Sequence, residues 1–136
     1  AFTTHDTIIR LLEDYSSDDT VITLHGYLRI IPAQICSKFN IYNGHPADVD
    51  AYPELKGFNP QEKTWHNRHR YKHIGAIVHK VAPEVDSGRI EVIKTTPDYN
   101  FSSKDALYSD LKTLSLESWK QFFEELINEF GPIKSN

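Results

Sequence analysis

Apolar residues along this chain follow two kinds of pattern, and the two kinds alternate. Short runs of β-branched and apolar residues predict strands at residues 20–24, 39–42, 74–81 and 89–95. Apolar residues at helical spacing, or a residue that can start a helix, predict helices at residues 4–15, 32–38, 61–71, 104–114 and 116–130. Strands that alternate with helices are typical of an α/β fold with a mostly parallel sheet covered on both faces.

The loops that follow the predicted strands contain the polar residues that could bind or react with a ligand. If the strands ending at residues 24, 42 and 81 are parallel neighbours, their loops meet at the sheet edge where ligands bind in such folds. The strands at 74–81 and 89–95 form a hairpin with a wide turn at 82–88. The strand at 89–95 then runs antiparallel at the margin of the sheet.

The carboxyl-terminal helices have clear signals at their ends and on one face. Ser102 or Ser103 is expected to cap the helix at 104–114, and Gly131-Pro132 to end the helix at 116–130. Core packing is the favoured interpretation of the apolar stripe on the last helix, which consists of Trp119, Phe122, Phe123, Leu126, Ile127 and Phe130.

Length and composition narrow the function classes. The 136 residues fit one domain, and a net charge of −4 argues against nucleic acid as the main partner. Cys36 is the only cysteine, which favours a reducing compartment such as the cytoplasm. No apolar run reaches the roughly 20 residues of a membrane span, and the first residues do not resemble a signal peptide. The start at Ala1 and the lack of Met suggest a processed product or a piece of a longer polypeptide.

The segment Asn43-Gly44-His45-Pro46 is the first candidate site. Residues i and i+2 at the end of a strand can point the same way, so an amide and an imidazole can reach one point in space. That pair suits a reaction in which an oxygen gains negative charge while a nitrogen changes protonation. The alternative is an ordinary turn, because Asn, Gly and Pro are common turn residues.

Asp86 is the third candidate, in the turn at 82–88. A carboxylate beside His45 could hold the ring, stabilise its charged form, or take a proton directly or through a water. The alternative is that Asp86 caps a turn, since Asp-Ser-Gly is a common turn sequence.

Three segments, taken in order and spacing, resemble the folate-dependent formyltransferase family. Residues 26–31, GYLRII, are similar to the family's G-[YF]-[ML]-R-I-L segment. Residues 41–46, IYNGHP, are similar to its N-x-H-P segment, and residues 75–88 are similar to its G-x-x-x-H-x-V…[ED]-V-D-x-G hairpin. The family includes glycinamide ribonucleotide, methionyl-tRNA and sugar-nucleotide N-formyltransferases.

The resemblance implies transfer of a formyl group from N10-formyltetrahydrofolate to the amine of a small-molecule acceptor, such as a nucleotide or nucleotide sugar. Asn43 would donate to the developing oxyanion, and His45 would stabilise the same charge or protonate the departing folate nitrogen. Asp86 would hold His45 and assist proton transfer. The folate would lie against two segments, which consist of Leu28, Arg29, Ile30 and Ile31, and of Ala82, Pro83, Glu84, Val85 and Asp86.

The resemblance also implies a Rossmann-like but incomplete fold. Residues 1–136 would form a single formyltransferase-like domain that lacks the family's amino-terminal β-α-β half, because no glycine precedes Gly26 to form its Gly-rich loop. A second chain or another segment could supply the missing strands. The loop between Pro46 and Lys56 is longer than the family usually has and carries three acidic residues, and it is expected to be a lid over the acceptor.

Other functions remain open from the sequence. Water in place of the amine would make a formyltetrahydrofolate hydrolase with the same site, and a folate-binding or assembly module without turnover is a third possibility. His66, His69 and His73 could share a helix face as a metal site, but neighbouring Lys and Arg favour a solvated basic face that contacts folate glutamate or an acceptor phosphate, and we expect no metal. His25 and His79 are expected to be structural.

Overall fold

The structure is a computed structural model that describes residues 20–24, 39–82 and 88–130. Its elements in chain order are β1 (Val21–Leu24), β2 (Asn40–His45), the 3-10 helix η1 (Pro53–Leu55), α3 (Pro60–His66), the 3-10 helix η2 (Arg68–Arg70), β3 (Ile74–Lys80), β4 (Ile90–Thr96) and α4 (Lys104–Phe130). The helices expected at 4–15 and 32–38, and Cys36, lie outside the described residues.

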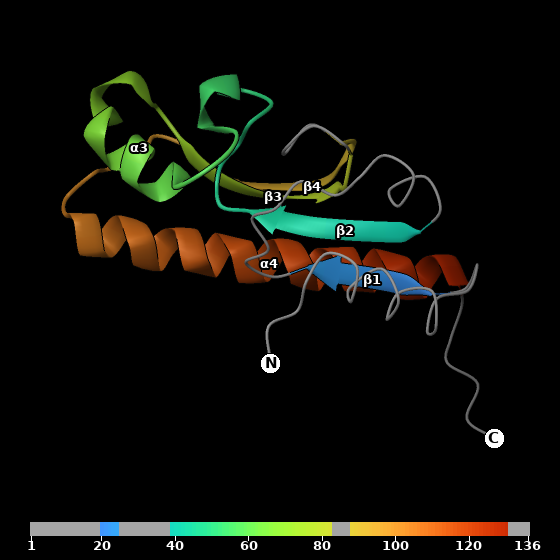
Figure 1. Cartoon of the computed structure of the whole chain (residues 1–136). Helices are drawn as coiled ribbons and strands as arrows, with labels where there is room; N and C mark the ends of the chain where they lie inside the picture. The colour runs from blue at the N-terminus through green and yellow to red at the C-terminus, as the bar shows by residue number, and fades with distance from the viewer. Residues whose placement is uncertain (1–19, 25–38, 83–87, 131–136) are drawn as a thin grey trace, which may run out of the picture.

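The strands form one mixed sheet in the order β1-β2-β3-β4 (Figure 1). β1 is parallel to β2, whereas β3 runs antiparallel to β2 and β4 antiparallel to β3. The α/β class and the hairpin at the margin are confirmed. A parallel arrangement of all three strands ending near 24, 42 and 81 is wrong, because the chain leaves β2 through α3 and re-enters the sheet at the same end (Figure 1).

β2 is longer than the sequence predicts, and this changes the setting of the candidate site. The expected strand end at Tyr42 is wrong, because Asn43, Gly44 and His45 pair with residues of β3. Asn-Gly usually favours a turn, but here the chain stays extended. Pairing with β3 on one side, and with β1 as far as Asn43 on the other, provides hydrogen-bond partners for the backbone N–H and C=O groups of β2. Asn43 and His45 are therefore strand residues with fixed directions.

The helices also differ from expectation at their ends. α4 is one continuous helix rather than two, since residues 114–117 contain no helix breaker. Ser103 caps it as expected, because its Oγ accepts a hydrogen bond from the Ala106 N–H at 3.1 Å. α3 ends at His66 rather than near 71, and the chain then tightens into η2. Neither described α-helix is long and apolar enough to cross a membrane.

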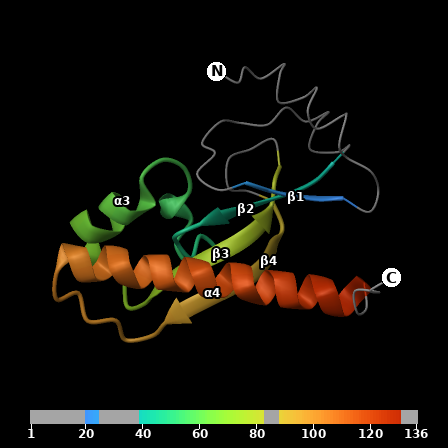
Figure 2. The same ribbon diagram turned by 90° about the horizontal axis from the view of Figure 1, so that it is seen from below.

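α4 covers one face of the sheet (Figure 2). Leu107, Leu111 and Leu114 pack with Ile74 and Ala76. Further along the helix, the ring of Phe122 packs with the strand residues Val78 and Val92. Burial of these side chains supplies most of the free energy that holds the helix to the sheet, at roughly 25 cal/mol per Å² of apolar area.

The apolar stripe of the last helix is only partly core. Trp119 and Leu126 pack with Phe122 as expected, but Phe123 is 40% exposed and Ile127 is 48% exposed. Each lies roughly 100° or more around the helix from Phe122, so it faces away from the sheet. Core packing is therefore wrong for these two residues.

The opposite face of the sheet is covered near the end of β2 by the loop at 46–59. Ala47, Val49 and Leu55 are buried there and form one cluster with Tyr71 and with Ile77 of β3. The loop is therefore packed on itself and on the sheet, which agrees with the short helix η1 inside it.

Gly44 permits the close approach of α4 to β2. A Cβ at this position would lie 2.7 Å from Nε1 of Trp119 and 3.2 Å from its Cε2. The Trp119 ring is held in turn by edge-to-face packing on Phe122, with ring centroids 5.6 Å apart. Only a residue without a side chain fits below this ring.

Gly44→Ala should therefore destabilise the fold by about 1–3 kcal/mol, because the indole must move or the strand must shift. The measurement is the free energy of unfolding in denaturant, compared with Trp119→Phe and with the double variant. The smaller ring should relieve part of the clash, so the double variant should lose less than the sum of the two single changes. Additive losses would show that Trp119 does not set the need for glycine.

Candidate functional site

Asn43 and His45 lie on the same face of β2, the face turned away from α4. They are two residues apart in a strand, so their side chains share a face. Gly44, between them, points toward Trp119 of α4, which fixes the direction of both neighbours. The prediction that one short segment presents an amide and an imidazole on the same side is confirmed in geometry, though by a strand rather than a loop.

The ring of His45 is buried, and one of its nitrogens bonds to a backbone carbonyl. Its exposed fraction is 6%, and Nε2 lies 2.8 Å from the carbonyl oxygen of Leu55. A carbonyl oxygen can only accept, so Nε2 must carry a hydrogen and donate it. Nδ1 is therefore the ring nitrogen that can gain or lose the second proton.

His79 belongs to the same place, and sequence reasoning gave it only a structural role. It is directly opposite Asn43 in the pairing of β2 with β3, so the two side chains share a face. His79 is 2% exposed, and its Nε2 and the Oδ1 of Asn43 are both buried atoms. The strand register could have identified this neighbour, but the predicted end of β2 at Tyr42 concealed it.

The remaining predicted site residues fall mostly outside the described residues. Asp86 and seven of the expected folate contacts are in this group, so their position relative to His45 stays a prediction: Leu28, Arg29, Ile30, Ile31, Pro83, Glu84 and Val85. Ala82 is described and half-buried just beyond β3. The adjoining Val81 N–H donates to the Ile41 carbonyl at 2.8 Å, so the hairpin turn begins beside β2.

A cavity of about 550 Å³ lies beyond the end of β2 on the side of α4, and sequence reasoning did not find it. Pro46, which follows His45, forms part of its wall, and Gln61 of α3 forms another. The rest of the wall comes from α4, through Tyr108, Ser109, Leu111, Lys112 and Ser115. A volume of this size suits a small molecule, and the wall offers hydroxyl, amide and ammonium groups for polar contacts.

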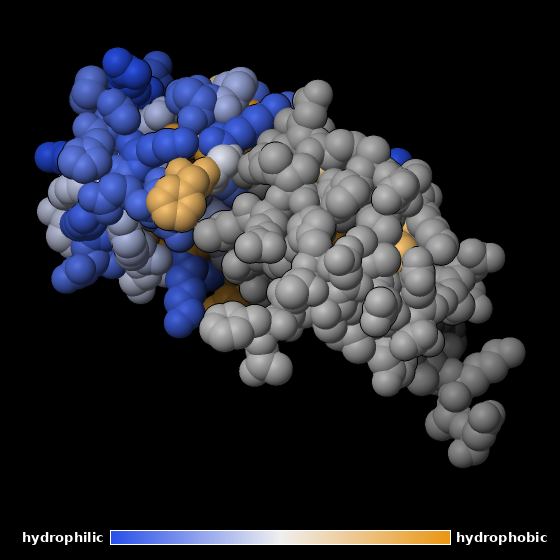
Figure 3. All heavy atoms as spheres, viewed as in Figure 1, coloured by the Kyte–Doolittle hydropathy of each residue, from blue (hydrophilic) through white to orange (hydrophobic). Residues whose placement is uncertain are grey.

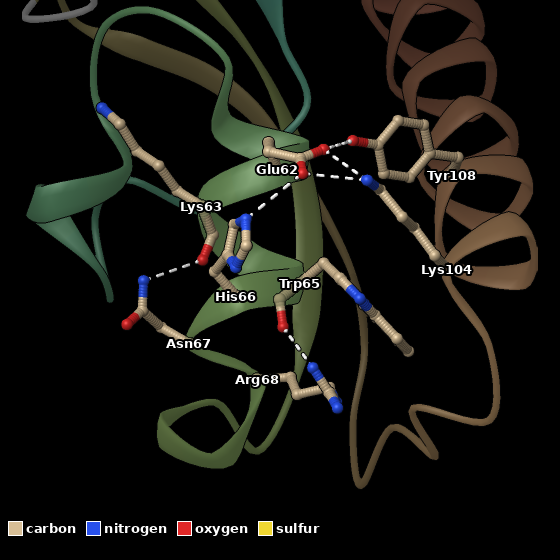
Figure 4. Close-up of polar contacts among 8 residues, drawn as sticks. All are labelled: Glu62, Lys63, Trp65, His66, Asn67, Arg68, Lys104 and Tyr108. Carbon is tan, nitrogen blue, oxygen red and sulfur yellow. Dashed lines mark hydrogen bonds and ion pairs between the residues drawn. The ribbon is translucent and has the colours of Figure 1, made fainter.

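Glu62 ties α3 to α4 beside this cavity (Figure 4). Lys104 Nζ lies 2.8 Å from its carboxylate, the Tyr108 hydroxyl donates to the same carboxylate, and His66 Nε2 lies 3.3 Å away. The hydrogen bond from Lys104, followed by that from Tyr108, lowers the pKa of Glu62 below its usual value of 4.5. The same contacts raise the pKa values of Lys104 and Tyr108.

The three histidines considered as metal ligands do not share a helix face. His66 ends α3 and pairs with Glu62, while His73 lies just before β3 and bonds to Asp48 at 2.8 Å. No group of three potential metal ligands occurs in the part of the chain that the structure describes. The surface over α3 and η2 is hydrophilic (Figure 3), with Lys63, Arg68 and Arg70 exposed.

Comparison with protein families places this geometry in context. The family model described as Formyl transferase matches residues 3–120. A phosphoribosylglycinamide formyltransferase of Dictyostelium discoideum is 31% identical over 99 residues, which are 66% of this chain and 46% of that protein. The chain thus spans about half the length of this relative.

Solved structures show the same fold. A phosphoribosylglycinamide formyltransferase of Bacillus halodurans has a TM-score of 0.74 at 16% identity, over 99% of this chain and 69% of that one. The formyltransferase PseJ of Anoxybacillus kamchatkensis, solved with a UDP-sugar and tetrahydrofolate, has a TM-score of 0.65 at 20% identity, over 85% of this chain and 58% of that one. At these identities the likeness establishes the fold alone.

The pairing of Glu62 predicts a pH dependence of stability. Because the pKa of Glu62 is lower in the folded chain, its contribution is fully present above pH 4.5 and is lost as the pH falls through the lowered value. Wild type should therefore lose more unfolding free energy on acidification than Glu62→Gln does. Glu117→Gln, which removes an exposed carboxylate of α4, is the matched control and should follow wild type. Identical acid profiles for wild type and Glu62→Gln would contradict this role.

Proposed function

Because the chain belongs to the formyl transferase family, we propose that it transfers a formyl group from N10-formyltetrahydrofolate to the amine of a small molecule. The observation that carries this proposal is the placement of Asn43 and His45 on one face of β2, with the His45 ring buried and its Nε2 bonded to the Leu55 carbonyl. An amide donor and an imidazole held in this way suit a reaction that builds charge on an oxygen.

The three side chains act on the oxygen and on the protons of the proposed reaction. The folate supplies the formyl group, and the acceptor amine forms a new C–N bond as the bond to N10 breaks. The Asn43 amide donates a hydrogen bond to the formyl oxygen while it carries negative charge. His45 stabilises the same charge or delivers a proton to N10, and Asp86 holds His45 and accepts the proton that leaves the amine, directly or through a water.

The folate would lie over the face that carries Asn43. The start of the hairpin turn beside β2, through the bond from Val81 N to Ile41 O, fits a ligand that contacts both elements. We assign its contacts to Leu28, Arg29, Ile30 and Ile31, and to Ala82, Pro83, Glu84, Val85 and Asp86. Main-chain groups of these segments would pair with the flat donor and acceptor edge of a pterin.

The acceptor would enter by the cavity beside Pro46. Its volume of about 550 Å³ fits a nucleotide or nucleotide sugar, and Lys112 in its wall can pair with a phosphate. The loop at 46–59 is packed against the sheet, so it forms a side of this region rather than an open flap.

The chain would form one domain, residues 1–136, that corresponds to the carboxyl part of the family core. β1 lies at the margin of the described sheet, and the matched region covers 46% of the relative from Dictyostelium discoideum. Strands beyond β1 would come from another segment or from a second chain.

The first experiment is a titration of the purified protein with a non-hydrolysable folate analogue, followed by a screen of amine acceptors. A formylated amine supports the transferase. Free formate without an amine product would instead indicate a hydrolase, and analogue binding without any turnover would indicate a binding or assembly module.

Asn43→Ala and His45→Ala should each lower formyl transfer by about 10²–10³-fold, because each removes a donor to developing charge. Rates are measured by quenched product analysis, and folding is checked by circular dichroism. Asp50→Ala, an exposed change nearby, is the control and should keep wild-type rates. Turnover like that of wild type in either site variant would refute the assigned roles.

Asp86→Asn should lower the rate more than it weakens folate binding, because the amide keeps the size of the side chain but cannot accept the amine's proton. The rate constant and the dissociation constant of the folate analogue are measured on the same preparation. Equal losses in both would move Asp86 from proton transfer to a binding role.

A further inference from the structure

A buried carboxylate in the loop after β2 is the starting observation. Asp48 is 6% exposed, and its Oδ1 accepts a hydrogen bond from the Ala51 N–H at 3.0 Å. Its Oδ2 lies 2.8 Å from Nε2 of His73. The other ring nitrogen of His73, Nδ1, lies 3.1 Å from the Tyr52 hydroxyl. Asp48, His73 and Tyr52 therefore form a continuous network, named here the loop network.

The donors and acceptors of the loop network run in one consistent direction. The Lys72 N–H donates to the Tyr52 oxygen at 3.3 Å, so that hydroxyl is free to direct its own hydrogen at Nδ1 of His73. His73 then donates from Nε2 to Asp48. The Tyr52 hydroxyl and the His73 ring each accept one hydrogen bond and donate another, and the Asp48 carboxylate accepts at the end of the series. A buried carboxylate that is bonded in this way avoids the cost of an unpaired charge.

Close packing locks the loop network to the residues that lead into β3. A Cβ built on Gly75 would lie 2.9 Å from Cβ of Asp48, so the loop lies directly on the strand backbone. The Tyr52 ring packs on Tyr71 and on His73, with centroids 4.7 Å and 4.8 Å away. The loop is thus fixed at residues 48–52 from two sides.

The same loop contains Leu55, whose carbonyl bonds to the His45 ring. Leu55 follows Tyr52 by three residues, and its N–H donates to the Tyr52 carbonyl at 3.0 Å. The Leu55 carbonyl in turn accepts the hydrogen of His45 Nε2 at 2.8 Å. A movement of Tyr52 would therefore also move the Leu55 carbonyl, one short helical turn away, which bonds to His45.

We propose that Asp48, His73 and Tyr52 are positioning residues for His45: they hold the Leu55 carbonyl where it accepts the hydrogen of Nε2 and so favours the Nε2–H tautomer. This inference rests on the proposed function for its catalytic consequence, but its tautomer statement stands independently. The proposal gives the network no contact with the reacting atoms, so its effect on rate would pass through His45.

The test is ¹⁵N NMR of the histidine rings in the whole protein, with the His45 signals assigned by their loss in His45→Gln. In wild type, neutral His45 should be in the Nε2–H form. Asp48→Asn should give a mixture of the two tautomers and lower kcat by about 10- to 100-fold, with unchanged binding of a folate analogue. Asp50→Asn, an exposed carboxylate in the same loop, is the matched control and should change neither readout.

Tyr52→Phe serves as the milder variant, because it keeps the ring packing and removes only the hydroxyl. It should change the tautomer ratio and kcat in the same direction as Asp48→Asn, by a smaller factor. An Nδ1–H tautomer in wild type would overturn the proposal, and so would a pure Nε2–H tautomer with wild-type kcat in both variants. A shifted tautomer in a protein that transfers no formyl group would support the positioning role while refuting the proposed function.

Discussion

The contact between Gly44 and the Trp119 ring is the constraint on which the rest of the structure depends. A Cβ at Gly44 would lie 2.7 Å from the indole, so α4 can lie across β2 only because this strand position has no side chain. Strand alternation then turns Asn43 and His45 to the other face. One packing contact thereby separates the face that packs on α4 from the face that carries Asn43 and His45.

The second face owes its order to the loop after β2. Ala47, Val49 and Leu55 bury their side chains against Ile77, so the loop gains its rigidity from apolar packing. Polar bonds then specify details that apolar packing cannot, such as which nitrogen of His45 carries a hydrogen. α4 stays on the first face, where it supplies core residues such as Leu111 and lines the cavity at the end of β2 with residues such as Lys112.

Prediction succeeded where a local signal and the tertiary structure favour the same outcome. The β-branched runs gave β1, β3 and β4 within one residue of the observed ends, and Ser103, one of the two expected caps, caps α4. Prediction failed where local sequence preference and the observed structure differ. Asn43-Gly44 has the composition of a turn but pairs with β3. The sequence pattern predicts separate helices at 104–114 and 116–130, but residues 104–130 form one helix.

The sequence alone determined the chemistry available and its family, because Asn43, His45 and Asp86 are recognisable by residue type and spacing, and the Formyl transferase model matches residues 3–120. Tertiary structure alone decided that His79 lies opposite Asn43, that Leu55 orients His45, and that α4 forms the cavity wall. The physical reason is that each of these depends on contacts between residues distant in the chain. Local propensity carries no information about such contacts, whereas burial and backbone pairing fix them together.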